Sequence, residues 1–172
     1  WKKEGKPAME VRCGMNTGQM IVGNMGGKDR FDYTGIGDSV NLASRLEGAN
    51  KQYGSYIMIS DMTYQHVKGK IVVRELDLIQ VKGKTEPVKV WEVLGTVDMQ
   101  ATEEQKKANE LYHEGLKLYR QKNWQEAIAH FQQAFKLDGT CRVAEIYEQR
   151  SGLYQLNPPP EDWNGVFIIT TK

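Results

Sequence analysis

Asn41 and Arg45 stand four residues apart in DYTGIGDSVNLASRLE, residues 32–47. On a helix, residues at this spacing lie on one face, one turn apart. The amide can donate and accept hydrogen bonds, while the guanidinium keeps its charge and presents several donors in a planar fork. Thr34 adds a hydroxyl just ahead of the helix. A polar pair at this spacing is usually only the solvated face of a helix, so the two residues alone do not establish a site.

The surrounding sequence predicts the helix that this pair needs. Asp38 or Ser39 can cap its N-terminus, apolar residues recur at helical spacing, and Gly54 ends the region. Strands are expected at residues 11–15, 19–23, 55–60, 71–83 and 86–95, with a short strand or turn at DYTGIG and a helical turn at DMTYQHV. The last two strands favour an antiparallel hairpin. Mixed elements of this kind predict an α+β sheet with helices on one face.

From about Thr102 the hydrophobic period becomes helical, and glycine becomes rare, since thirteen of the 17 glycines precede residue 97. Small and aromatic residues then recur at helix-packing positions, namely Gly115, Ala127, Phe131 and Ala134. This spacing resembles one tetratricopeptide unit, in which small residues let two antiparallel helices pack closely. Gly139 stands where that repeat usually has its loop proline.

We therefore divide the chain near Val97. Residues 1–97 form the α+β part, residues 98–156 form a helical region of tetratricopeptide type, and residues 157–172 form a proline-rich tail with a strand-like end. The chain begins without an initiator Met and runs almost at once into a strand. We interpret it as a piece of a longer protein.

Composition and short motifs exclude several function classes. A net charge of +1 provides no basic field, which argues against a nucleic-acid partner, and no apolar run approaches the length needed to cross a bilayer. Cys13 and Cys141 suggest no disulfide framework and favour a reducing cytoplasm. Three scattered histidines argue against zinc. GNMGGK is too short for a phosphate loop and has Asp29 where Ser or Thr is needed, and GIGDSV lacks the third glycine of a dinucleotide fingerprint.

Three stretches in order carry a more specific signal: GMNTGQMIVGNMG, YTGIGDSVNLASRLE and VKGKTEPVKVWEV. Together they closely resemble the C-terminal half of the class III nucleotidyl cyclase domain, the adenylate and guanylate cyclase family. The resemblance covers roughly residues 9–95 and implies the C-terminal half of a ferredoxin-like α+β domain. The α-helical hairpin that follows is similar to the extension of some bacterial multidomain adenylate cyclases. The implied reaction converts ATP to 3′,5′-cyclic AMP and pyrophosphate in intracellular signalling.

The resemblance also assigns roles to four residues. Asn41 would orient the ribose, and Arg45 would neutralise the phosphorane-like transition state, so these two are the predicted catalytic residues. Lys82 in VKGK matches the family's lysine that holds the terminal phosphates. Thr34 matches the base-reading position, where many adenylate cyclases have Asp and a bacterial subgroup has Thr. The string of motifs, rather than any single residue, supports these assignments.

The family's two metal-binding aspartates lie in the other, N-terminal half of the domain. The ten residues before Val11 cannot contain both motifs, and Asp29, Asp32 and Asp38 do not match them. We refer to the longer protein of which this chain is expected to be a piece as the parent. The Mg²⁺ or Mn²⁺ ions of the parent are expected to have no ligands in this chain, and the chain alone is expected to be inactive. The implied partners are ATP and a second copy in a head-to-tail homodimer. The parent is expected to be cytoplasmic, with room for a membrane anchor upstream.

A second hypothesis is non-enzymatic. In it, a degenerate or truncated cyclase domain serves as a scaffold, and the helical region recruits a protein partner. The presence of both Asn41 and Arg45 favours an active parent. Two correctly placed aspartates in the upstream sequence would distinguish an enzyme from a regulatory module.

Overall fold

The computed structural model describes residues 4–5, 7, 9–27, 30–81, 86–99 and 101–169. Its elements in chain order are β1 (Cys13–Met15), β2 (Ile21–Gly27), β3 (Arg30–Ile36), α1 (Asp38–Tyr53), β4 (Ile57–Ser60), α2 (Asp61–Val67), β5 (Ile71–Val81), β6 (Val88–Thr96), α3 (Glu103–Arg120), α4 (Trp124–Leu137), α5 (Arg142–Leu156) and β7 (Phe167–Ile169). The predicted α+β class is confirmed. Within these ranges, no helix has both the length and the apolar character that crossing a membrane requires.

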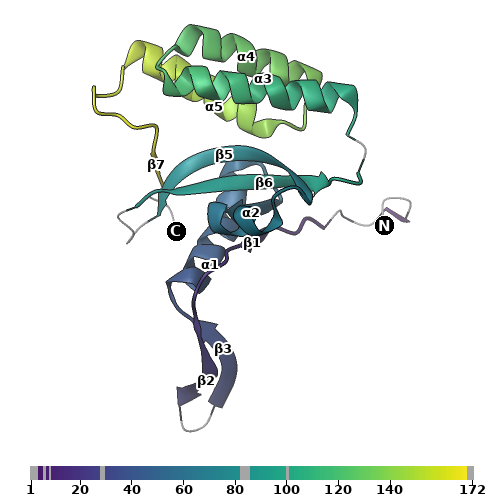
Figure 1. Ribbon diagram of the computed structural model, residues 1–172, viewed down its shortest axis with the longest axis vertical. Helices are drawn as coiled ribbons and strands as arrows, with labels where there is room; N and C mark the ends of the chain where they lie inside the picture. The colour runs from purple at the N-terminus through teal and green to yellow at the C-terminus, as the bar shows by residue number, and fades with distance from the viewer. Residues whose placement is uncertain are drawn as a thin grey trace.

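A five-stranded sheet forms the centre of the molecule, in the order β1-β4-β6-β5-β7. Figure 1 shows its strands β5 and β6 below helices α3, α4 and α5. β5 and β6 pair antiparallel, as the two apolar runs predict, and β6 pairs antiparallel with β4. β1 joins β4 in parallel at one edge, and β7 joins β5 in parallel at the other. The last strand of the chain therefore returns to the sheet formed by the first half.

The helices cover the two faces of this sheet unequally. Tyr53 of α1 and Arg150 of α5 both contact the side chain of Asp77 in β5, so α1 and α5 lie on the same face. Val90 of β6 pairs across from Asp77 and points to this face. Trp91, the next residue, points to the other face and bonds to α2. The long helices therefore share one face, and the short α2 packs on the other.

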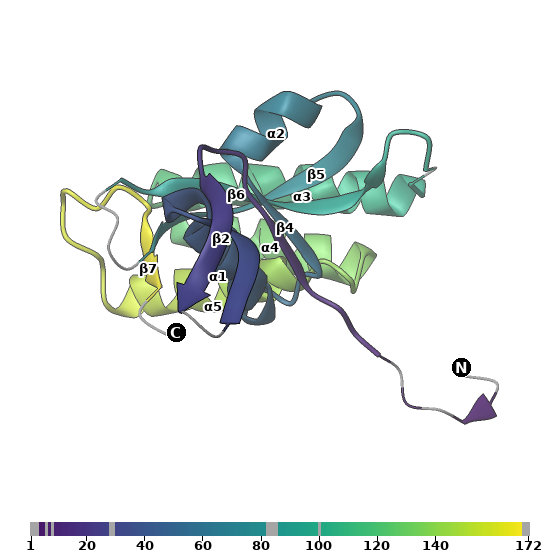
Figure 2. The same ribbon diagram turned by 90° about the horizontal axis from the view of Figure 1, so that it is seen from below.

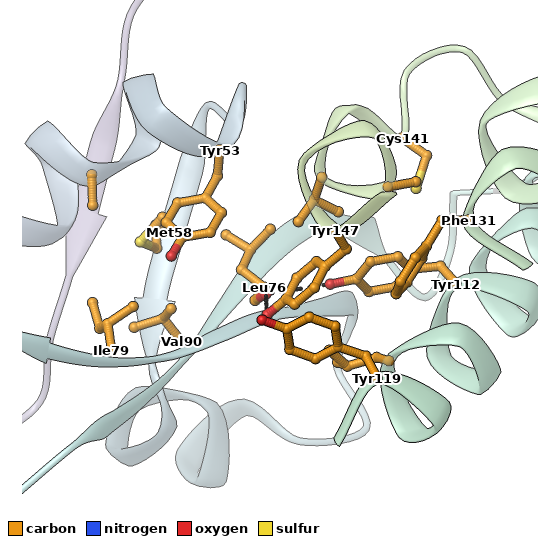
Figure 3. Close-up of a cluster of buried hydrophobic side chains, with 14 of the residues drawn as sticks. Tyr53, Met58, Leu76, Ile79, Val90, Tyr112, Tyr119, Phe131, Cys141 and Tyr147 are labelled. Carbon is orange, nitrogen blue, oxygen red and sulfur yellow. Dashed lines mark hydrogen bonds between the residues drawn. The ribbon is translucent and has the colours of Figure 1, made fainter. Parts of the chain in front are cut away.

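The helical region docks onto the main chain of β5. The ladder between β5 and β6 shifts register between Glu75 and Asp77, which leaves Leu76 as an extra residue. Tyr112 of α3 donates a hydrogen bond to the Glu75 carbonyl at 2.7 Å, and Tyr147 of α5 donates one to the Leu76 carbonyl at 2.9 Å. Figure 3 shows both rings beside Leu76 in the buried core. Burial raises the pKa of both hydroxyls, which remain donors.

Buried ions strengthen this contact between helices and sheet. The Arg74 side chain of β5 is only 2% exposed and lies 3.2 Å from Glu92 of β6 and 3.6 Å from Asp138. Its Nε also donates to Asn109 of α3 at 3.3 Å. A buried guanidinium is tolerated when several partners satisfy its donors, as they do here. The sheet and the helical region therefore share one hydrophobic core.

His113 of α3 lies in the same interface. Its Nδ1 lies 2.8 Å from the Asn109 carbonyl oxygen, and its Nε2 accepts a hydrogen bond from the Glu75 backbone N–H at 3.4 Å. Burial lowers the pKa of His113 below its ordinary value. The unfolded chain therefore binds this proton more readily than the folded protein, and stability falls as the pH drops below about 6.5.

We expect His113→Gln, which cannot titrate, to reduce this pH dependence. Between about pH 7.5 and 5.5, its melting temperature should fall less than that of the wild-type chain. Comparing the two proteins cancels the titration of all other groups. His66→Gln, at an exposed position of α2, is the matched control and should keep the wild-type profile. Identical profiles for His113→Gln and wild type would show that His113 titrates as it does in the unfolded chain.

α3 and α4 form the close helix pair that the small residues predict. A Cβ added at Gly115 would lie 2.8 Å from the Phe131 ring, so the glycine permits the approach. Ala127, Phe131 and Ala134 are fully buried on the facing side of α4. The tetratricopeptide-like packing of these two helices is confirmed.

Ala127→Trp should lower the free energy of unfolding by about 1–3 kcal/mol or more, because the larger ring overpacks a site without spare volume. Ala129→Trp, on the exposed side of the same helix, should change it by less than about 0.5 kcal/mol. Denaturant unfolding of the 172-residue chain measures both variants. Equal stability of Ala127→Trp and wild type would mean that the helices do not meet at this position.

A second, two-stranded sheet projects from the body as the β2–β3 hairpin (Figure 1). Seen from below, it lies in front of α1 (Figure 2). Its antiparallel register places Thr34 opposite Gly23. Large apolar side chains of the hairpin are exposed, among them Phe31 at 65% and Tyr33 at 77%. Apolar surface of this kind marks a contact surface more often than a solvated one.

Candidate active site

The helix that carries the predicted catalytic residues begins at a glycine turn directly after β3. Gly37 is the N-cap residue, with φ of 148°, a conformation that favours glycine, and its carbonyl accepts the Asn41 backbone N–H at 3.1 Å. The prediction that Asp38 or Ser39 caps the helix is wrong. The helix starts earlier, so both residues lie in its first turn, and no side chain caps it. Asp38 there complements the positive end of the helix dipole.

Two glycines of GMNTGQM allow the N-terminal segment to pass directly against α1. A Cβ at Gly14 would lie 2.2 Å from the Glu47 backbone nitrogen, and one at Gly18 would lie 2.1 Å from Ser39 Oγ. Asn16, between them, donates a hydrogen bond to the Ser39 carbonyl at 3.0 Å. The motif thus fixes the first turns of α1. Sequence reasoning did not assign this role, although the paired glycines were its signal.

α1 is also anchored in the core. Its buried residues are Leu42, Leu46, Ala49, Asn50 and Tyr53. Asn50 is the polar member of this set, and its amide donates to the Cys13 carbonyl at 2.9 Å while its Oδ1 accepts from Ser55 Oγ at 2.8 Å. Gly54 ends the helix, as predicted from the sequence, and adopts the left-handed conformation with φ of 64°. α1 is therefore held at both ends.

Asn41 and Arg45 are exposed, one turn apart on α1. Neither side chain forms a hydrogen bond or ion pair with the part of the chain that the structure describes, so both are available to a ligand. Thr34 is exposed on β3, three residues before the Gly37 turn that joins this strand to α1. Lys82 lies outside the described residues. The structure therefore connects three of the four predicted site residues through one turn.

Among the described residues, no three His, Cys, Asp or Glu side chains lie close enough to hold a metal ion. The polar groups of the candidate site are thus an amide, a guanidinium and a hydroxyl. Such a set can position and neutralise a phosphorylated substrate, since its members are donors that remain neutral or positive at physiological pH.

Known protein families match both the α+β part and the helical region of this chain. Residues 1–95, more than half of the chain, match the adenylate and guanylate cyclase catalytic domain, and residues 108–141 match the tetratricopeptide repeat. The terminal-differentiation specific adenylate cyclase of Dictyostelium discoideum is 34% identical over 146 residues, covering 83% of this chain and 7% of that protein. Adenylate cyclase 1 of Rhizobium meliloti is 38% identical over 96 residues, covering 56% of this chain and 14% of that protein.

A similar solved structure is the adenylyl cyclase CyaB from P. aeruginosa, with 40% identity and a TM-score of 0.49, covering 59% of this chain and 51% of that one. The chain therefore spans only a small part of the curated relatives and about half of this structure. The match over residues 1–95 has the motifs and the fold described above, and the chain belongs to the adenylate and guanylate cyclase catalytic domain family.

Proposed function

We propose that this chain supplies the C-terminal half of an adenylate cyclase catalytic domain, which forms 3′,5′-cyclic AMP and pyrophosphate from ATP. The observation that carries the proposal is the exposed pair Asn41 and Arg45, one turn apart on a helix held at both ends. Membership of the cyclase family supports it.

In the proposed reaction, the ribose 3′-oxygen loses its proton and attacks the α-phosphorus in line. A new bond forms between these atoms, the bond from the α-phosphorus to the bridging oxygen breaks, and pyrophosphate leaves. Arg45 neutralises the charge that grows on the non-bridging oxygens, and Asn41 holds the ribose in line. Lys82 contacts the terminal phosphates, and Thr34 contacts the base. Positioning and charge stabilisation account for most of catalysis in phosphoryl transfer.

We propose that the Mg²⁺ or Mn²⁺ ions of the reaction bind to aspartates of the N-terminal half of the domain. The ions supply positive charge next to the phosphates. The described residues of this chain contain no suitable ligand group, so we assign no step to a metal held by them. In this proposal, Asn41 orients the ribose and Arg45 stabilises the charge on the phosphate, while the ions are held by the N-terminal half of the domain.

We propose a head-to-tail homodimer as the active assembly, with each site shared between subunits. The exposed apolar side chains of the β2–β3 hairpin and of the edge strand β1 support this proposal, among them Phe31, Tyr33 and Met15. ATP is favoured over GTP because the two curated relatives described above are adenylate cyclases and Thr34 is the base-reading candidate. The helical region is less suited to a partner on its α3 and α5 side, since Tyr112 and Tyr147 already bind β5 there.

A product assay tests this proposal in the intact protein, meaning this chain joined to its N-terminal half. With Mg²⁺ or Mn²⁺, ATP should yield cyclic AMP and pyrophosphate in equal amounts, and GTP should yield much less product. The 172-residue chain alone is the control and should yield neither. Hydrolysis of ATP without cyclisation, or cyclic GMP as the main product, would overturn the proposed function.

A further inference from the structure

We propose that Arg150 of α5 is a positioning residue for the cyclase reaction, acting through Asp77 and Tyr53 on the helix that carries Arg45. This inference rests on the proposed function. Arg150 Nη1 lies 2.5 Å from Asp77 Oδ2, and the Tyr53 hydroxyl donates to the same oxygen at 2.7 Å. One carboxylate oxygen thus joins the last residue of α1 to a side chain of the helical region.

Tyr53, Asp77 and Arg150, called the relay below, are buried together. Tyr53 and Asp77 are each 1% exposed, and the Arg150 side chain is 14% exposed. The second Asp77 oxygen accepts the Leu78 backbone N–H at 2.8 Å, so the carboxylate is satisfied on both sides. Removing one partner would leave a buried charge uncompensated, which costs much more than losing an exposed pair. The relay is therefore held in one geometry.

Arg150 also links the relay to the tail of the chain. Its guanidinium lies over the Phe167 ring of β7 at 3.8 Å and near the Tyr147 ring at 5.2 Å. Burial alone would lower the pKa of Arg150, but the Asp77 carboxylate raises it above its ordinary value, so the guanidinium stays charged. The Arg150 guanidinium of α5 therefore contacts β7 through Phe167 and is linked to α1 through Asp77 and Tyr53.

Beyond Tyr53, the end of α1 meets the helical region at Gly54, where an added Cβ would lie 2.9 Å from the Arg142 Cβ. An open polar pocket of about 430 Å³ lies beside this contact, lined by Lys51 and Gly54 on one side and by Arg142 and Gln149 on the other. The buried relay and the Gly54 contact therefore set the angle of α1 relative to α5. β1 also holds α1, through the contacts at Gly14 and Asn50.

Because α1 is long, a small tilt of the helix at Tyr53 would displace Arg45 at the candidate active site. Arg45 precedes Tyr53 by eight residues, or about 12 Å along the helix at about 1.5 Å per residue. A tilt of about 5° at Tyr53 would therefore move Arg45 by about 1 Å, a misplacement that can cost about 100-fold in rate. Groups that set this tilt should affect kcat, because substrate contacts made in the ground state tolerate such shifts better.

Tyr53→Phe tests the relay in the intact cyclase, because it removes one hydroxyl and keeps the ring. Tyr112→Phe is the matched control: it also removes a buried hydroxyl bonded to β5, but one that does not touch α1. We expect Tyr53→Phe to lower kcat by about tenfold with little change in KM. Tyr112→Phe should keep kcat within about twofold. Wild-type kcat in Tyr53→Phe, or an equal loss in Tyr112→Phe, would overturn the proposal.

Arg150→Met tests the other end of the relay. It should lower kcat by a similar factor, and combining it with Tyr53→Phe should cost less than the product of the two single losses, because both act through Asp77. Independent, multiplicative losses would contradict a shared path.

Hydrogen exchange of the 172-residue chain separates failure of this inference from failure of the proposed function. Tyr53→Phe and Arg150→Met should speed exchange of the last α1 turns, whereas Tyr112→Phe should not. Unchanged α1 exchange in the first two variants would overturn the relay, whether or not the parent makes cyclic nucleotide. A second outcome is that the wild-type parent makes no cyclic nucleotide while the two variants still show faster α1 exchange. That result would overturn the proposed function and the catalytic role of the relay, but not the contact between Tyr53, Asp77 and Arg150.

Discussion

Arg45→Ala in the intact cyclase should lower kcat by about 10²–10³ while leaving KM within about threefold. The guanidinium is exposed, has no partner among the described residues, and lies on a helix held at both ends. The backbone that carries it is therefore in place before the substrate arrives. In the proposed reaction, the charge that Arg45 meets develops mainly in the transition state, and a donor aimed at such charge contributes to kcat rather than to substrate binding.

Two further variants sharpen this prediction. Arg45→Lys keeps the charge but loses the planar fork, so it should recover only part of the rate. Lys51→Ala removes an exposed cation farther along α1 and should leave both kinetic constants near their wild-type values. Steady-state kinetics with ATP measure all three. A raised KM with unchanged kcat in Arg45→Ala would make this residue a ground-state anchor and would contradict the role proposed for α1.

Gly14→Ala should unfold or displace α1, lowering the free energy of unfolding by about 3 kcal/mol or more. The added Cβ would lie 2.2 Å from the Glu47 nitrogen and 2.3 Å from the Ala43 carbonyl oxygen. Both are backbone atoms of α1, so no side-chain rotation can relieve the clash, and the helix or β1 has to move. In the intact cyclase the same displacement should abolish most activity.

Gly48→Ala is the matched control on the helix itself. A Cβ there meets nothing within 4 Å, so the substitution should stabilise the chain by about 0.5–1 kcal/mol through helix propensity. Thermal and denaturant unfolding of the 172-residue chain compare the two variants. A Gly14→Ala chain as stable as wild type would show that β1 and α1 are not in direct backbone contact.

Local patterns predicted most of the secondary structure. The apolar residues at helical spacing before Gly54 predicted α1, and DMTYQHV predicted the turn of helix that α2 forms. The two apolar runs after residue 70 predicted β5 and β6, because hydrophobic periodicity and β-branched residues are properties of the segment alone. β2 and β3 are longer than the strand at residues 19–23 and the short strand or turn at DYTGIG that the sequence predicted, since their glycines and polar residues weaken the strand pattern.

Long-range packing could not be predicted in the same way. The sequence did not predict that Tyr112 and Tyr147 donate hydrogen bonds to the carbonyls of a bulge in β5, because that bulge forms only when β5 pairs with β6. The pairing of β7 with β5 and the ion pair of Arg150 with Asp77 likewise join segments far apart in the chain. Periodicity identifies the buried side of a helix but not the surface that covers it.

The candidate site depended on a motif string rather than on geometry. Thr34, Asn41 and Arg45 were selected by resemblance, and the structure adds the Gly37 turn and the Gly14 and Gly18 contacts that hold their helix. No spacing rule predicts these contacts, because a close backbone approach depends on the partner element as well as on the glycine.

Mixing two inactive variants of the intact protein tests the central claim most directly, namely that this chain supplies one side of a shared cyclase site. One variant carries Arg45→Ala, and the other lacks a metal-binding aspartate of the N-terminal half. Each alone should make almost no cyclic AMP. In a head-to-tail dimer, the mixed species has one intact site, so the mixture should recover about a quarter of wild-type activity when subunits exchange freely. A mixture that exchanges subunits and stays as inactive as its components would contradict the account.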